Sequence, residues 1–305
     1  MDVCYLLKQY EAGARSFVGV DLRGADLSGK TLVDVDLTGA NLMGANFSRA
    51  FLTKVNFSEA FLNWADLSFA KLSEADFNDA DLTKANLNGA FLVKANFAKA
   101  KLSGAALSHA NLRGASLERS NLCGANLTGV NLRSANLQRA NLNWSNLSGA
   151  RLSSANLTGA FLDGVNFKGA FLSGLDLRGV DLRGINLTEA RLNSANLAGA
   201  NLQSANLAAA RLQNVILDGA NLAASNLTGA VLHRANLNWS DLRQANLSAA
   251  DLSEANLLGV KIDGAKFTNT TLPVQMREYL DLLEMGDRLS QACNAVPQAL
   301  PTHDA

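Results

Sequence analysis

The sequence predicts an all-β solenoid, a rod built from one five-residue repeat with a short helix at each end. Every fifth residue from Phe17 to Leu272 is Leu, Phe or Ile, and no insertion shifts the register. The residue two before each of these centres is mostly Ala, and the residue just before it is mostly Asn or Asp. We call these the centre, the small position and the polar position, and we call the fifth residue of each repeat, two after the centre, the last position.

The five-residue period excludes the two ordinary regular structures. On a helix of 3.6 residues per turn, a step of five moves each apolar side chain about 140° beyond a full turn, so the apolar column would spread around the axis. A plain strand alternates its faces every two residues. A short extended piece followed by a turn fits the pattern, with the centre and the small position both facing inward.

These repeats resemble the pentapeptide-repeat family, whose motif is written A(D/N)LXX, as in Ala45-Asn46-Phe47. The resemblance covers Arg15 to about Pro273. It implies a right-handed quadrilateral β-helix in which four repeats form one square coil. About 13 coils, stacked at the roughly 4.8 Å spacing of neighbouring strands, would give a rod of about 60 Å.

The phenylalanines support a square coil independently of the resemblance. All Phe at centres have numbers that end in seven, and all Phe at polar positions have numbers that end in one. Both patterns require a spatial period of ten or twenty residues, which a triangular coil of fifteen residues does not supply. We therefore expect Phe57, Phe77 and Phe97 to stack as one aromatic ladder inside the rod.

Four segments follow from the extent of the repeat. Residues 1–14 are expected to form a helical N-terminal cap, 15–273 the β-helix, 274–293 a C-terminal helix, and 294–305 a disordered tail. Within the repeat, Leu175 and Ile185 stand where Ala is usual, so we expect a slightly swollen coil near 175–185.

Composition and motifs favour a non-enzymatic chain of a reducing compartment. The 27 basic and 27 acidic residues cancel, so net charge favours neither nucleic acid nor a membrane as a partner. No apolar run approaches the roughly 20 residues that span a bilayer, and the N-terminus lacks the features of a secretory signal. Three widely spaced cysteines predict no disulfide framework and no zinc site, and the expected location is cytoplasmic.

No catalytic, metal-binding or cofactor-binding residues are predicted. A regular solenoid places its polar side chains on flat walls rather than in a cleft, and no nucleophile, phosphate-loop or metalloprotease motif occurs. The Asn and Asp side chains at polar positions are expected to stabilise turns by hydrogen bonds.

Sorting residues by position modulo twenty predicts walls of different charge. The wall centred on 27, 47, 67 and onward, the neutral wall, is nearly uncharged. The wall centred on 32, 52, 72 and onward, the basic wall, has no acid between 75 and 250. Its candidate partner-binding residues are Arg113, Arg133, Arg151, Phe171, Arg191, Arg211 and Arg234.

Two interpretations of the basic wall compete. In the first, arginine replaces Asn or Asp by drift, and the planar guanidinium groups stack on Phe171 and on one another. In the second, the wall attracts an acidic protein surface or a nucleic-acid backbone. Neighbouring arginines on this wall are one strand apart and should repel each other. This cost favours the second interpretation, in which the wall binds a partner.

Three tryptophans occupy last positions, which face outward. Trp64 and Trp144 share one wall, and Trp239 lies on another. An exposed tryptophan serves either as a contact for a partner or as a cover for a neighbouring coil.

The leading hypothesis is a structural or interaction protein that presents flat walls to a protein partner. The resemblance implies a bacterial source, since uninterrupted members of the family are especially numerous in cyanobacteria. The alternative is a topoisomerase-directed protein similar to the quinolone-resistance members, which resemble acidic DNA, dimerise end to end and often carry loops. This chain has zero net charge and no loop, although its expected C-terminal helix offers a route to a homodimer.

Overall fold

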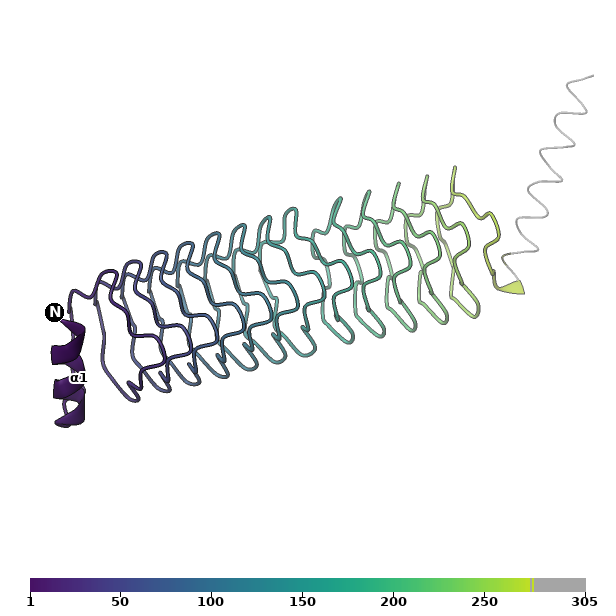
Figure 1. The fold of residues 1–305 in the computed structure, drawn as a ribbon. Coiled ribbons are helices and arrows are strands. Elements are labelled where there is room, and N and C mark those ends of the chain that lie inside the picture. The colour runs from purple at the N-terminus through teal and green to yellow at the C-terminus, as the bar shows by residue number, and fades with distance from the viewer. Residues whose placement is uncertain (275, 277–305) are drawn as a thin grey trace, which may run out of the picture.

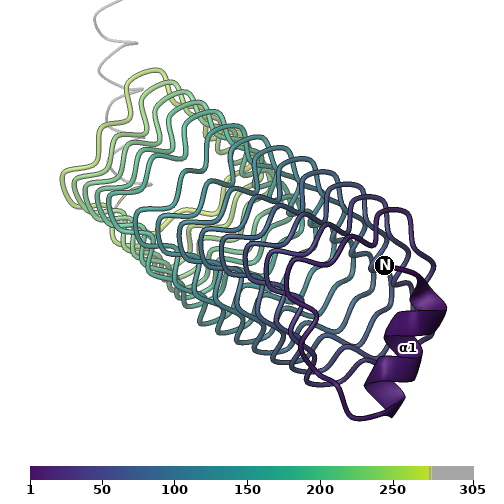
Figure 2. The same cartoon turned by 90° about the vertical axis from the view of Figure 1, so that its left-hand side faces the viewer.

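The computed structural model describes residues 1–274 and 276. The chain winds into a stack of coils that forms a rod, and α1, Val3–Glu11, lies across its N-terminal end (Figure 1, Figure 2). Apart from Val274 and Met276, the expected C-terminal helix and the expected tail lie outside the described residues. The domain boundaries stay predictions.

The coil contains twenty residues. Parallel bridges join residues twenty apart, from Ser16 with Asp36 to Asp251 with Thr271. Four pentapeptides therefore complete one turn of the rod, which confirms the four-sided coil and excludes a coil of fifteen residues. We name the four walls by their centres: the first wall contains Phe17 and Leu37, the second contains Leu22, and the neutral and basic walls follow in chain order.

The bridges in the described residues are isolated, and no continuous strand forms. The physical reason lies in the turn that each centre begins. The Ala50 N–H donates to the Phe47 carbonyl at 3.0 Å, which closes a turn directly after the extended piece. On each wall, every coil therefore contributes one bridged residue. The extended segments of this solenoid are shorter than ordinary β-strands.

A regular repeat donates three main-chain hydrogen bonds to neighbouring coils. In the repeat centred on Phe47, Phe47 and Arg49 donate to carbonyls of the following coil at 2.6 and 2.8 Å, and Asn46 donates to the preceding coil at 2.8 Å. The Asn46 side chain accepts a bond from the Ser48 N–H at 3.0 Å. This bond is the turn-stabilising role predicted for the polar position.

The last position of each repeat adopts a left-handed backbone conformation. Gly39 has a φ of 63°, and non-glycine residues such as Lys54 have similar values. Left-handed φ costs an L-residue roughly 1–2 kcal/mol, whereas glycine adopts it without steric cost. This requirement explains why glycine is frequent at this position.

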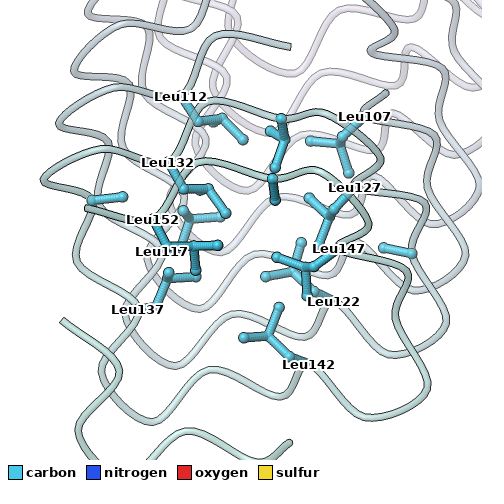
Figure 3. Packing of buried hydrophobic residues seen from close by; sticks show 14 of the residues in the cluster. Leu107, Leu112, Leu117, Leu122, Leu127, Leu132, Leu137, Leu142, Leu147 and Leu152 are labelled. Carbon is cyan, nitrogen blue, oxygen red and sulfur yellow. The ribbon is translucent and has the colours of Figure 1, made fainter. Parts of the chain in front are cut away.

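Centres and small positions form the core along the whole rod. Leucines one coil apart lie above one another, as Leu107, Leu127 and Leu147 do in Figure 3. These side chains are at most 1% exposed, and so are most of the alanines beside them. The small position matters because a large centre from the same side of the coil already fills the interior.

The aromatic ladder expected from the sequence is confirmed. The rings of Phe57 and Phe77 stack at a centroid distance of 5.1 Å, and those of Phe77 and Phe97 stack at 4.6 Å. Phe47 meets Phe57 edge to face at 5.9 Å. One wall thus contributes a continuous aromatic column to the core.

Helix α1 covers the first coil. Leu6 is fully buried, and Val3, Leu7 and Tyr10 pack against the core. The Val33 N–H donates to the Tyr10 hydroxyl at 3.1 Å. The helix therefore shields core and main-chain groups that the open end of a solenoid would expose.

We expect Leu6→Ala to loosen the first coil. Truncating a buried leucine costs about 2–5 kcal/mol, and the loss would fall on the cap. Hydrogen exchange of the Leu22 and Leu27 amides should accelerate, while exchange in the middle of the rod stays unchanged. Tyr5→Ala is the control, because Tyr5 is 54% exposed, and equal effects of the two substitutions would contradict the role of α1.

We expect Ala209→Gly to stabilise the rod and Ala208→Gly to destabilise it. Ala209 has a φ of 55°, and relief of left-handed strain is worth roughly 1 kcal/mol. Ala208 is not left-handed, so glycine there adds only an entropic cost of roughly 0.5–1 kcal/mol. Urea denaturation measures both changes, and the same sign for both would contradict the argument.

Candidate interaction surfaces

The predicted row on the basic wall exists in the structure. Bridges join Arg151 to Phe171, Phe171 to Arg191, and Arg191 to Arg211 in consecutive coils. The three arginines are exposed and Phe171 is half-buried. Their side chains therefore form one line along the rod, spaced by the roughly 4.8 Å between neighbouring strands.

The Phe171 ring lies between two guanidinium groups of this row. The Arg191 Cζ is 4.4 Å from the ring centroid, and the Arg151 Cζ is 5.8 Å from it. Such cation–π contacts contribute about 0.5–1 kcal/mol at exposed sites. They offset part of the repulsion within the row, which supports the stacking interpretation without removing the positive charge.

Arg113 and Arg133 extend the positive charge toward the N-terminal half of the basic wall. Both are exposed, and each follows a centre whose polar position is asparagine. The Asn131 amide donates to the Asn111 side-chain oxygen at 3.1 Å, which links the two repeats. The asparagines bond to each other and leave the two arginine charges without compensation.

Arginines at the equivalent position on other walls are neutralised within their own repeats. In the sequence Asp-Leu-Arg, the guanidinium bonds the aspartate of the same repeat, as Arg178 does with Asp176 at 2.6 Å and Arg183 with Asp181 at 2.7 Å. The hydrogen bond from Arg178 lowers the pKa of the Asp176 carboxyl below its ordinary value. The difference between Asp and Asn at the polar position thus decides whether an arginine directly after the centre is paired within its own repeat.

Five of the six candidate arginines form no salt bridge with any described residue. These are Arg113, Arg133, Arg151, Arg191 and Arg211. The sixth, Arg234, pairs with Glu254 at 2.7 Å, and that bond lowers the pKa of the Glu254 carboxyl. Arg234 therefore lies on the basic wall at the last position of its repeat, outside the row, and its charge is paired.

The tryptophans lie away from the basic wall. Trp64 and Trp144 are on the second wall, half a coil from the basic wall, and Trp239 is on the first. A Cβ added to Gly164 would approach the Trp144 ring to 2.3 Å, and Trp239 covers Gly259 in the same way. These rings cover the next coil, yet they remain 71% and 64% exposed, and Trp64 is 58% exposed.

The described residues contain neither a membrane-spanning helix nor a cluster of metal ligands. None of their helices has the length and apolar character needed to cross a bilayer. Within the same residues, no three His, Cys, Asp or Glu side chains gather as metal ligands. The free Cys4 and Cys123 lie on separate parts of the rod.

The model of the family described as pentapeptide repeats matches the chain in eight copies, several of them overlapping, between residues 21 and 269. The chain belongs to the pentapeptide-repeat family. Its square coil and its left-handed last positions are therefore the features of a pentapeptide-repeat protein. No protein among the curated ones matches the chain.

Several solved pentapeptide-repeat proteins are similar to this chain. HetL, a protein involved in heterocyst differentiation regulation in the cyanobacterium Nostoc sp. strain PCC 7120, is 32% identical, with 90% of this chain and 98% of HetL covered and a TM-score of 0.30. A protein of the Arabidopsis thaliana thylakoid lumen is 34% identical over 36% of this chain and 76% of its own, with a TM-score of 0.35. QnrB1, a plasmid-mediated fluoroquinolone resistance protein, is 17% identical over 85% of this chain and 98% of its own, with a TM-score of 0.28.

For this pentapeptide-repeat protein, sequence reasoning missed the Asp-Leu-Arg pairing and left open whether the tryptophans cover a neighbouring coil or contact a partner. The Asp-Leu-Arg pairing was visible as a tripeptide, since Asp and Arg flank one centre. The tryptophan packing was visible as a glycine twenty residues after the aromatic residue, and Phe69 with Gly89 and His109 with Gly129 follow the same rule. The first signal requires a comparison of the two residues on either side of a centre. The second requires a comparison of residues twenty apart on the same wall.

We expect Asn111→Asp and Asn131→Asp to neutralise Arg113 and Arg133. Each new carboxyl should form the pair that Asp176 forms with Arg178, so its pKa should fall below the usual value of about 3.9. The pairing would be present above that value and lost as the pH falls through the lowered pKa. NMR titration measures it, with Asn221→Asp as the control because Ala223 replaces the arginine, and an equal pKa in all three would contradict the pairing.

Proposed function

We propose that this chain is a non-enzymatic interaction protein that docks its basic wall on an acidic protein surface. The proposal treats the chain as a right-handed rod of about 13 coils, closed by helical caps, whose regular backbone holds side chains at fixed intervals. The observation that carries it is the row of arginines without ion pairs on one flat wall. Although the protein has zero net charge, this wall has no acid between residues 75 and 250.

The geometry of the row favours a protein partner with regularly spaced carboxylates. The cation–π contacts orient the guanidinium groups of Arg151 and Arg191 against Phe171. Guanidinium groups bind carboxylates through paired hydrogen bonds, and less side-chain entropy is lost when the group is already held. Exposed Phe51 and Phe91, 49% and 41% accessible on the same wall, add apolar contact area of the kind that protein interfaces use.

We expect the triple variant Arg151→Glu, Arg191→Glu and Arg211→Glu to lose the native partner. The partner is captured from the source cell with the wild-type chain, identified, purified, and titrated against both chains by calorimetry. The wild-type Kd should rise with salt, as screened charge contacts require, and the variant should bind at least tenfold more weakly.

The matched control changes the same charge on other walls. Lys84→Glu, Lys101→Glu and Arg139→Glu reverse three exposed residues that form no salt bridge with a described residue. This variant should bind as tightly as the wild type. Salt-insensitive binding, or equal losses in the two variants, would remove the basic wall as the interface, and capture of nucleic acid in place of a protein would support the nucleic-acid alternative.

The topoisomerase-directed function is the second candidate, and a gyrase supercoiling assay distinguishes it. A protein that resembles DNA needs a strongly acidic surface, whereas this rod has zero net charge and a basic wall. We expect no change in supercoiling at micromolar protein, with or without a quinolone. Protection of gyrase from the quinolone would favour this function over the docking proposal.

A further inference from the structure

The ladder of hydrogen bonds between coils is interrupted at one place. Every polar-position residue from Ser16 to Asp251 is bridged to the residue twenty positions later, except Asn156 and Phe161. Their expected partners, Asp176 and Asp181, lie across the interruption. The gap is visible in Figure 1 as the wider spacing between two coils in the middle of the rod.

The interruption leaves main-chain groups unpaired on both edges. On one edge, the N–H groups of Leu157, Gly159 and Leu162 lack the acceptors that neighbouring coils provide. On the other, the N–H groups of Asp176 and Asp181 find no acceptor within the described residues. The Leu177 N–H, in contrast, bonds the next coil normally at 2.7 Å.

Bulky residues explain why the coils separate here. Leu175, Val180 and Ile185 fill three successive small positions of one coil. Single valines at this position, such as Val55 and Val215, leave the ladder intact. The swelling expected near 175–185 therefore takes the form of an opened ladder.

The bridges are lost on two walls, and on the basic wall the Ser154 N–H also lacks its bond to the next coil. The first and second walls are separated, while the neutral and basic walls remain bridged through Asn166 with Asn186 and through Arg151 with Phe171. The two coils are therefore joined by bridges along the neutral and basic walls and separated along the first and second walls. The gap between them is open to solvent only on the first and second walls.

A cleft of about 330 Å³ occupies the opening. Leu157, Leu162 and Val180 supply its apolar lining, and Ala160 lies in it partly exposed, although alanines in most other coils are fully buried. At the outer edge, Arg178 is paired with Asp176 and Arg183 with Asp181. The cleft is thus apolar on its inner side, and its mouth carries these two neutralised pairs together with the Asp163 carboxylate.

We infer that this cleft binds an extended peptide segment by strand addition. Unpaired N–H and C=O groups at a sheet edge are a template for another chain, and peptide-binding domains use such edges through main-chain hydrogen bonds. The edges here cross two adjacent walls, each one repeat wide. The segment that matches them therefore has about ten residues, with apolar side chains directed inward and a turn between its halves.

The chemistry of the cleft favours a peptide over other ligands. Its free polar groups belong to the main chain and recur with the repeat, which a peptide can match on both sides. The self-neutralised pairs at the mouth offer no attraction to a polyanion. The site is independent of the proposed function, because the cleft opens on the first and second walls and the arginine row lies on the basic wall.

The repeat itself supplies a probe. A fluorescent decapeptide with two copies of Ala-Asn-Leu-Thr-Gly, the sequence at 125–129 and 155–159, carries the required pattern of apolar centres and turns. We expect saturable binding to the full chain by fluorescence anisotropy, with slower hydrogen exchange at Leu157, Leu162, Asp176 and Asp181. A peptide of the same sequence with N-methylated main chain should bind at least tenfold more weakly, because it lacks the donors.

A repaired coil tests the cause of the opening. The variant Leu175→Ala, Val180→Ala and Ile185→Ala restores small residues, so the ladder should close, the four amides should become protected without peptide, and peptide affinity should fall at least tenfold. The control Val35→Ala, Val55→Ala and Val215→Ala makes similar changes where the ladder is intact and should keep wild-type binding. Protected Leu197 and Leu202 amides verify that both variants remain folded.

Three results would overturn the inference. In the first, the Leu157 and Leu162 amides are already protected in the free wild-type chain, so the cleft is closed in solution. In the second, these amides exchange rapidly and the decapeptide does not bind. In the third, they are protected only as protein concentration rises, which would assign the cleft to a second copy of this chain.

Discussion

The structure depends on one constraint, which is that each main-chain group on a wall must meet its partner one coil away. With coils of twenty residues, the partner of any residue is twenty positions later, and a single insertion would displace every following pair. Buried main-chain groups without partners are costly. The unbroken five-residue register and the small residue beside each large centre both follow from this constraint, since coils must also approach closely enough to bond.

Much of the fold was predictable because the same residue types recur at the same positions of every five-residue repeat. The period, the inward columns and the Phe57–Phe97 stack require only the positions of Leu, Phe and Ala. Helix α1 was predictable from Val3, Leu6 and Tyr10. The absence of continuous strands was not, because it depends on how soon each turn closes after its bridged residue.

The wall on which each surface residue lies was predictable from the sequence. The ion pairs and hydrogen bonds that those residues form were less predictable. Sorting by twenty placed Arg151, Phe171, Arg191 and Arg211 in one line, as the bridges show. It did not reveal that Arg234 would be paired, because the pairing depends on the side-chain conformations of Arg234 and Glu254 in neighbouring coils. Leu175 and Ile185 indicated a swollen coil, but only the hydrogen bonds show that the bridges are lost on two walls and kept on the other two.

The opened ladder also bears on how the rod comes apart. In a solenoid, each coil is stabilised by its two neighbours, so cooperativity passes through every interface in turn. The interface between the two separated coils lacks half of its bridges. Unfolding on one side of it is therefore coupled less strongly to unfolding on the other side. The rod is then two blocks joined by a weak contact, and heat or a pulling force would separate their unfolding at residues 154–186, although the repeat continues through this region without a break.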